Sequence, residues 1–266
     1  MSNLNTLSQD HSSGTLSDSG SKILDLVSSM GETLLLNGAE IARVQTTMEM
    51  VAKTYGKDEI DVFAISNGIF VTMREKDSSR CTQVKHVPLS SSNLGKVAMI
   101  NQLSREIVEN KLPLDDALAK MDQILKAPPT PFALELAACA VGVACFCYLF
   151  GGNFYDSVAA LFVGMLLCAC QKHIRKAKLS KMIQTVLEST IVTLGGLFIS
   201  RLFPGLNPDM IVIGGLIILV PGVPFTTSIR DFFNGDYLSG TIRLIDALLV
   251  ALCMAIGVGI VHTLFQ

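Results

Sequence analysis

A proline-rich interruption lies inside an apolar segment, residues 210–229, which reads MIVIGGLIILVPGVPFTTSI and contains no charged residue. An uncharged segment of this length can span a lipid bilayer as a helix. Pro221 and Pro224 stand on either side of Gly222 near its middle, and a proline inside a helix removes a backbone donor and clashes with the preceding turn. The sequence therefore predicts a helix that is broken at membrane depth.

A broken membrane helix can bind a solute without any catalytic side chain. Lipid cannot hydrogen-bond the freed backbone groups, so these groups must be buried in protein or line a wet cavity. The half-helix ends carry partial charges that favour small ions or zwitterions near the bilayer midplane. We therefore expect substrate binding or translocation at Pro221, Gly222 and Pro224, with the hydroxyls of Thr226 and Thr227 as further ligands. The alternative is a purely structural kink.

Carboxylates inside apolar segments are the second group of candidates. Glu188 lies about two turns into one such segment, Asp246 lies near the start of another, and Glu135 begins a third. Ionisable side chains are costly in lipid and usually face a cavity or a partner. Glu188 is a candidate proton-carrying carboxyl or one side of a subunit contact. Asp246 is a weaker translocation candidate, and Glu135 fits an interfacial position.

Two short motifs stand out in the polar front half. In NGAEIARV, Glu40 and Arg43 are three residues apart on one ridge of a helix, which predicts a surface ion pair. In AISNGIFVT, Asn67 and Gly68 lie between two alternating segments and predict a β-hairpin.

Several classes of function are excluded or disfavoured by what the chain lacks. It contains no Walker loop, G-x-G-x-x-G, G-x-S-x-G or H-E-x-x-H motif, so we expect neither an ATP-driven pump nor a standard hydrolase, and no cofactor. Ser66, Asn67 and His86 are a conceivable hydrolytic set, but turn chemistry explains the first two. None of the seven cysteines forms a C-x-x-C pair, so no metal site or disulfide framework is indicated. A net charge of −2 and the absence of Trp disfavour nucleic-acid binding.

Charge is unevenly distributed and divides the chain into two halves. Residues 1–131 hold 13 of the 21 Lys and Arg and 16 of the 23 Asp and Glu, whereas long apolar segments begin only near Phe132. The sequence therefore predicts an α+β cytoplasmic domain followed by an all-α transmembrane domain of about five helices. The expected boundaries are a disordered leader at 1–21, the cytoplasmic domain at 22–127, a Pro-rich linker at 128–132 and the transmembrane domain at 133–266.

The cytoplasmic domain is expected to contain helices and a small antiparallel sheet. Apolar residues recur at helical spacing within 22–55 and again within 93–126. EIDVFAIS, IFVTMRE and CTQVKHV alternate as strands do. The transmembrane spans are expected at about 133–150, 154–170, 182–200, 210–229 and 244–265.

Basic residues set the expected topology. The loop before the third span is rich in Lys and Arg, which places it in the cytoplasm by the positive-inside rule. Arg230 and Arg243 then fall on the same side, as does the amino-terminal domain, and the carboxyl terminus faces outward. A location in the cell inner (plasma) membrane is an expectation that follows from the family resemblance given below. The residues of the basic loop are Lys172, Arg175, Lys176, Lys178 and Lys181.

The segments LLLNGAEIARV, AISNGIFVT, LVPGVP and DFFNGDYLSGTIR together resemble the threonine/serine exporter family, and more closely its shorter, YjjP-like members, which correspond to its amino-terminal half. By this resemblance, Glu40 and Arg43 match the amino-terminal signature, and Pro221, Gly222 and Pro224 match the membrane motif. Family membership implies export of threonine, serine or dicarboxylates such as succinate. It also implies a second small membrane subunit that completes the transporter. The alternative is a homo-oligomer, in which another copy of this chain takes the place of that subunit.

The leading hypothesis is one subunit of a secondary exporter of small carboxylate solutes, driven by an ion gradient because no nucleotide site exists. The alternatives are a membrane-anchored hydrolase and a regulatory subunit, both of which would act through the cytoplasmic domain.

Overall fold

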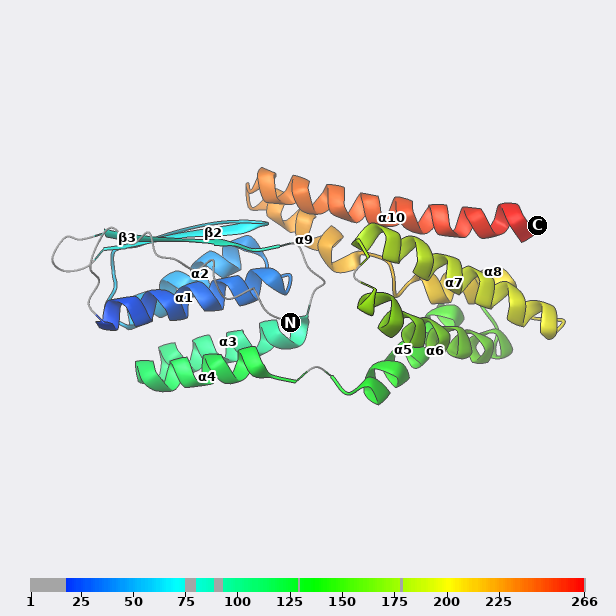
Figure 1. Cartoon of the computed structure of the whole chain (residues 1–266), viewed down its shortest axis with the longest axis horizontal. Coiled ribbons are helices and arrows are strands. Elements are labelled where there is room, and N and C mark those ends of the chain that lie inside the picture. The colour runs from blue at the N-terminus through cyan, green and yellow to red at the C-terminus, as the bar shows by residue number, and fades with distance from the viewer. Residues whose placement is uncertain (1–17, 75–79, 89–92, 129, 178, 266) are drawn as a thin grey trace. The chain divides into compact units, whose positions relative to one another are not determined.

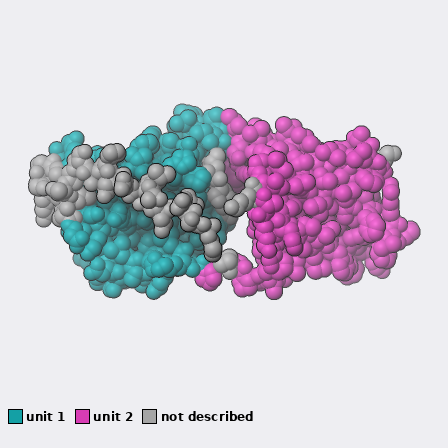
Figure 2. Space-filling model, viewed as in Figure 1, with its two compact units in different colours: residues 1–127, 226–243 teal, residues 128–225, 244–266 magenta. Residues whose placement is uncertain are grey.

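The computed structural model describes residues 18–74, 80–88, 93–128, 130–177 and 179–265. The chain forms two compact units, which Figure 2 shows in different colours. The first contains residues 1–127 and 226–243, and the second contains residues 128–225 and 244–266. A segment of the apolar half, residues 226–243, thus belongs to the unit that the front half builds.

Helices α1 and α2 form the middle of the first unit. α1 (Asp18–Leu36) includes the last four residues of the expected leader, 18–21, and the rest of that leader lies outside the described residues. α1 ends where Gly38 adopts a φ of 88°, which lets the Ala39 amide donate back to the Leu34 carbonyl. α2 (Ile41–Thr54) follows directly.

The predicted antiparallel sheet is present, with strands in the order β1-β2-β3. β1 (Ile60–Ile65) pairs with β2 (Gly68–Arg74), which pairs with β3 (Arg80–His86). The hairpin was predicted correctly, but its two turn residues are Ser66 and Asn67. Gly68 is already the first residue of β2 and pairs with Ile65.

The first unit has three layers. In Figure 1 the sheet covers one face of α1 and α2, while α3 (Leu94–Asn110) and α4 (Leu114–Lys126) cover the other. The alternation of side chains along β2 explains how the sheet packs against the helices. Ile69, Val71 and Met73 point into the core and are at most 1% exposed. The helical periodicity of α1 buries Leu26, Val27, Met30 and Leu34 completely.

The first unit also includes a helical corner from the apolar half. α9 (Gly222–Phe233) and α10 (Tyr237–Phe265) meet at a short turn in which Gly235 has a φ of 82°. The division between the two units falls within both helices, after Phe225 in α9 and after Arg243 in α10. We refer to residues 226–243 as the α9–α10 corner.

The second unit is a packed set of apolar helices, α5 (Phe132–Leu149), α6 (Phe154–Lys176), α7 (Lys181–Leu202) and α8 (Pro208–Leu216), together with the rest of α10. Glycines allow close approach: a Cβ at Gly214 of α8 would lie 3.0 Å from backbone atoms of Cys147 in α5. Residues that share the core of this unit are Val143, Cys147, Ala160, Val163, Leu167, Val192 and Ile211.

Four helices in the described part of the chain are long and apolar enough to cross a membrane. They are α5, α6, α7 and α10, with 18, 23, 22 and 29 residues. The expected span 210–229 is instead divided between α8, with 9 residues, and α9, with 12. The predicted fold class is therefore present in its parts, a small sheet with helices and a set of membrane-spanning candidates.

Candidate functional site

The interruption of the fourth expected span lies just before Pro221. α8 ends at Leu216, and α9 begins at Gly222, so residues 217–221 are not helical. Tight turns occupy the gap, with the Leu219 amide donating to the Leu216 carbonyl at 2.9 Å. Pro224 lies in the first turn of α9, where a missing amide hydrogen costs little. Pro221 is therefore the last residue of the break, and Pro224 belongs to the start of the second half-helix.

The start of α9 is accessible. Gly222 and Thr226 are exposed, while Pro221, Pro224 and Thr227 are half-buried. A Cβ built on Gly222 would meet no described atom within 4 Å. Because a helix amino terminus carries positive partial charge, this end can attract a carboxylate.

Glu188 lies half-buried on α7 and interacts with Gln171 and Arg175 of α6. Nη1 of Arg175 also lies 3.3 Å from Oε1 of Glu135 on α5. The Arg175 guanidinium thus forms an ion pair with one of the carboxylates singled out in the sequence and lies near a second.

Asp246 of α10 pairs with Lys181 at the start of α7, with an N–O distance of 2.6 Å. The Lys181 side chain is 46% exposed and that of Asp246 is 18% exposed. The three carboxylates singled out in the apolar segments therefore each lie near a basic side chain, and Glu135 and Asp246 form ion pairs.

A row of hydroxyls on α7 was not singled out in the sequence. Thr185, Ser189 and Thr193 are spaced by four residues and buried, and each donates to the carbonyl four residues earlier. Gly257 of α10 faces this row, because a Cβ there would lie within 3 Å of Ser189 Oγ. The row serves close packing of α7 and α10, and its four-residue spacing was the signal that could have revealed it.

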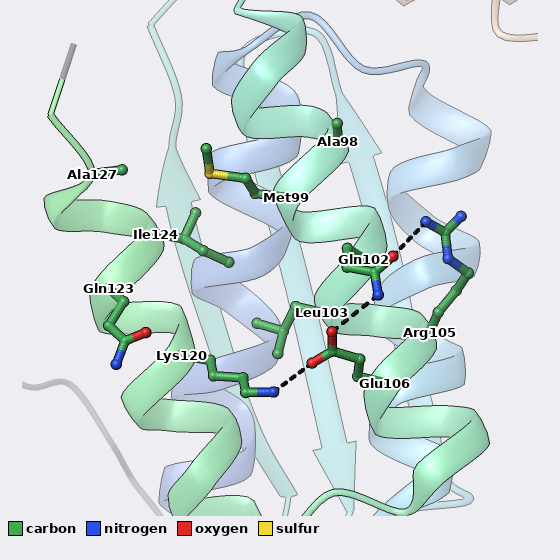
Figure 3. A pocket seen from close by; sticks show the side chains of 10 residues that line it. All are labelled: Ala98, Met99, Gln102, Leu103, Arg105, Glu106, Lys120, Gln123, Ile124 and Ala127. Carbon is green, nitrogen blue, oxygen red and sulfur yellow. Dashed lines mark hydrogen bonds and ion pairs between the residues drawn. The ribbon is translucent and has the colours of Figure 1, made fainter. Parts of the chain in front are cut away.

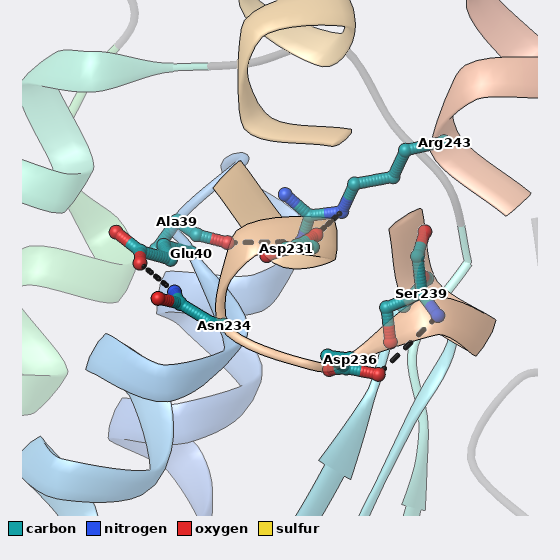
Figure 4. A network of polar contacts seen from close by, with 8 residues as sticks. Ala39, Glu40, Asp231, Asn234, Asp236, Ser239 and Arg243 are labelled. Atoms are coloured by element: carbon teal, nitrogen blue, oxygen red, sulfur yellow. Dashed lines mark hydrogen bonds and ion pairs between the residues drawn. The ribbon is translucent and has the colours of Figure 1, made fainter. Parts of the chain in front are cut away.

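Glu40 pairs with the α9–α10 corner and not with Arg43. Its Oε2 accepts from Arg230 at 3.1 Å, and its Oε1 accepts from Asn234 at 2.5 Å, as Figure 4 shows for Asn234. Arg43 is exposed and forms no ion pair with Glu40. The predicted surface pair fails because Glu40 is the N-cap of α2, with an extended backbone (φ −66°, ψ 139°), so helical spacing does not apply to it.

A buried ion pair lies behind Glu40. Nε of Arg243 is 3.5 Å from Oδ2 of Asp231, and their side chains are 8% and 1% exposed. Arg243 also donates to the Ala39 carbonyl at 2.9 Å. Burial raises the pKa of Asp231, assisted by the nearby Asp236 and Glu40 carboxylates and opposed by Arg243.

The β1–β2 turn supplies a third contact to the corner. Ser66 Oγ donates to the Ser239 carbonyl at 3.1 Å, and Ser66 is 3% exposed. Because the Ser66 hydroxyl is buried and donates this hydrogen bond, it is not available as the nucleophile of a hydrolytic set with Asn67 and His86. Asn67 is exposed, and its carbonyl accepts from the Val87 amide at 2.9 Å, so Asn67 and Gly68 shape the turn.

The residues of this polar cluster come from three distant parts of the sequence. The sequence pointed to Glu40, and it indicated Arg230 and Arg243 only as markers of topology, whereas nothing in the sequence singled out Asp231, Asn234 or Ser239. We call this set the corner cluster: Ala39, Glu40, Ser66, Arg230, Asp231, Asn234, Ser239 and Arg243.

A groove of about 660 Å³ lies between α3 and α4 (Figure 3). Met99, Leu103 and Ile124 provide its apolar lining. Glu106 accepts from Lys120 at 2.5 Å and from Gln102 at 3.0 Å, and these hydrogen bonds lower the pKa of Glu106. The polar side chains at the rim of the groove thus form hydrogen bonds with one another.

Within the described ranges, no group of three or more His, Cys, Asp or Glu side chains could hold a metal ion. The seven cysteines are free thiols.

The sequence profile of the threonine/serine exporter family matches residues 25–265. A Mycobacterium tuberculosis protein named "Probable threonine/serine exporter" is 26% identical over 242 residues, which are 89% of this chain and 45% of that protein. The Corynebacterium glutamicum "Threonine/serine exporter" is 22% identical over 90% of this chain and 50% of its own length.

A shorter relative has nearly the same length as this chain. The Escherichia coli "Probable succinate transporter subunit YjjP" is 25% identical over 244 residues, which are 88% of this chain and 91% of that protein. The chain therefore spans about half the length of the exporters from M. tuberculosis and C. glutamicum. No solved structure matches it.

Proposed function

Because the chain belongs to the threonine/serine exporter family, we propose that it is one subunit of an exporter of small carboxylate-bearing solutes. Threonine and serine are the first candidate substrates, and succinate is the second. A relative named as a threonine/serine exporter and a relative named as a succinate transporter subunit each align with most of this chain. The family transports and does not catalyse a reaction, so the hydrolase alternative has no support.

The observation that carries the proposal is the break between α8 and α9. The carboxylate of the substrate lies against the amino-terminal end of α9, where the helix dipole favours negative charge. Thr226 and Thr227 lie one turn further along the same helix and are further ligands. Among the described residues, no atom lies within 4 Å of a Cβ built on Gly222, which supports this assignment because a solute needs room.

An ion gradient drives export in this proposal, because the sequence contains no nucleotide-binding motif. Glu188 is the proposed proton carrier. Its half-buried position inside an apolar helix supports this role, because an ionisable side chain in a membrane-spanning segment is costly and usually serves transport or a partner contact.

The proposed transporter needs a second membrane polypeptide or a second copy of this chain. Relatives of about twice the length support the first option, as does the word "subunit" in the name of the E. coli relative. The second part supplies the remaining side of the translocation path.

The proposed topology places the amino-terminal domain in the cytoplasm and the carboxyl terminus outside the inner membrane. The basic loop that contains Lys172, Arg175 and Lys181 supports this orientation. The folding of Arg230 and Arg243 into the same unit as the amino-terminal domain is further support, since both must then lie on one side of the membrane.

The test is a bulky substitution at the break. Gly222→Trp is expected to abolish export of threonine, serine and succinate from vesicles that contain the full chain and its partner. Gly259→Trp is the matched control, because Gly259 also has open space around it but lies in α10. Unchanged export by the Gly222 variant, at an equal amount of protein in the membrane, would rule out the site.

The groove between α3 and α4 favours a second candidate function, in which the cytoplasmic domain senses a ligand and regulates the transporter. Binding of radiolabelled threonine or succinate that is weakened by Met99→Trp while export persists would favour it.

A further inference from the structure

The α9–α10 corner is attached to the amino-terminal domain through its outer surface and through its interior. At the surface, Glu40 uses one carboxylate oxygen for Arg230 and the other for Asn234. The Glu40 side chain is 18% exposed, whereas that of Arg230 is 66% exposed. Glu40 is thus a partly buried acceptor on which two donors from the end of α9 converge.

The interior attachment is the buried ion pair between Asp231 and Arg243, in which each charge compensates the other. Asp231 and Arg243 are almost fully buried, and removal of either would leave the other without compensation. Asp231 belongs to α9 and Arg243 to α10, so their contact also holds the two helices at the corner. The bond from Arg243 to the Ala39 carbonyl then fastens this pair to the residue that precedes Glu40.

Both attachments restrain one continuous helix. α9 runs from Gly222 to Phe233 without interruption, so its 12 residues are about 18 Å long at 1.5 Å per residue. Its last two turns carry Arg230 and Asp231, and its first turn follows the break. Because a short helix moves as a stiff body, restraint at its carboxyl-terminal end also restrains Gly222.

We propose that Glu40 is a positioning residue for transport: together with Arg230 and Asn234 it holds α9, and with it the amino-terminal edge of the break, in the orientation that export requires. This inference rests on the proposed function, in which the break lies on the translocation path. It makes the amino-terminal domain a mechanical part of the transporter.

The experiment combines hydrogen exchange with transport in the full chain. Glu40→Gln keeps the size of the side chain but removes the charge that attracts Arg230. Amides in residues 222–233 are expected to exchange about fivefold faster, which corresponds to roughly 1 kcal/mol of lost stabilisation. The initial rate of threonine, serine or succinate export is expected to fall by a similar factor of about five.

Rescue separates a specific contact from a general loss of stability. The charge-swapped variant Glu40→Arg with Arg230→Glu is expected to restore both slow exchange and export, at least in part. Glu49→Gln is the matched control, because Glu49 lies on α2 and pairs only across one turn with Lys53 at 3.8 Å. This variant should change neither measurement.

Two results would overturn the inference. One is unchanged exchange in residues 222–233 of the Glu40 variant, and the other is faster exchange with undiminished export. If the unmodified protein exports none of the three solutes, the proposed substrates are wrong, while the exchange measurement still decides whether Glu40 holds α9.

Discussion

Glu40 and Arg230 lie 190 positions apart in the chain and form an ion pair with an N–O distance of 3.1 Å. The first residue caps a helix of the amino-terminal domain, and the second lies on the helix that follows the membrane break. Both residues belong to the first compact unit, in which residues 226–243 fold with the front half of the chain. It also gives the most conspicuous acidic residue of NGAEIARV a concrete partner.

The buried pair behind it should be sensitive to the loss of one partner. Asp231→Ala is expected to lower the free energy of unfolding by about 3 kcal/mol, because it leaves the Arg243 cation buried without its counter-charge. The measurement is thermal or denaturant unfolding of the purified protein in detergent. The double variant Asp231→Leu, Arg243→Met should lose less free energy of unfolding than Asp231→Ala alone. A loss equal to the sum of the losses from Asp231→Leu and from Arg243→Met, each measured alone, would contradict this account.

Glu106 should make stability depend on pH. The hydrogen bond from Lys120 lowers the pKa of Glu106 below its ordinary value of 4.5, so its contribution is present above that value and is lost as the pH falls through the folded-state pKa. The unmodified protein should therefore unfold at a higher temperature than Glu106→Gln at pH 7. This difference should disappear in acid below the lowered pKa, and an equal difference at both pH values would refute the assignment.

The contact between α7 and α10 should tolerate no side chain at Gly257. Gly257→Leu places a Cβ within 3 Å of Ser189 Oγ, and the two helices must then separate. We expect a loss of about 2 kcal/mol or more in the free energy of unfolding. Gly259→Leu, two residues further along α10 and in open space, is the control, and equal melting temperatures for the two variants would contradict the close approach.

Glu188 and Asp246 should behave differently in transport. Glu188→Gln is expected to reduce export driven by a pH gradient about tenfold, because the variant cannot carry a proton, and to flatten its pH dependence. Asp246→Asn breaks an ion pair with a partly exposed Lys181 and should change export by less than about threefold. Export by proteoliposomes under an imposed pH gradient is the measurement, and an unaltered pH profile for the Glu188 variant would remove it as the proton carrier.

Local patterns accounted for the elements and several of their ends. Helical spacing predicted the helices of both halves, and alternation predicted all three strands. The turn between β1 and β2 was displaced by one residue, because Asn67 and Gly68 favour a turn in isolation while pairing with Ile65 recruits Gly68 into β2. The broken span was also readable, since proline acts on its own backbone and on the turn before it.

What the sequence by itself determined is therefore set by interactions over a few residues: the apolar segments, the strand alternation and the presence of a break in the fourth expected span. Only the tertiary structure decided that Glu40 pairs with Arg230, that Arg243 lies buried against Asp231, and that Arg175 approaches both Glu135 and Glu188. The reason is physical. A charged side chain shows in the sequence what it can pair with, but the partner it meets depends on the packing of apolar surfaces elsewhere in the chain, which brings distant segments together.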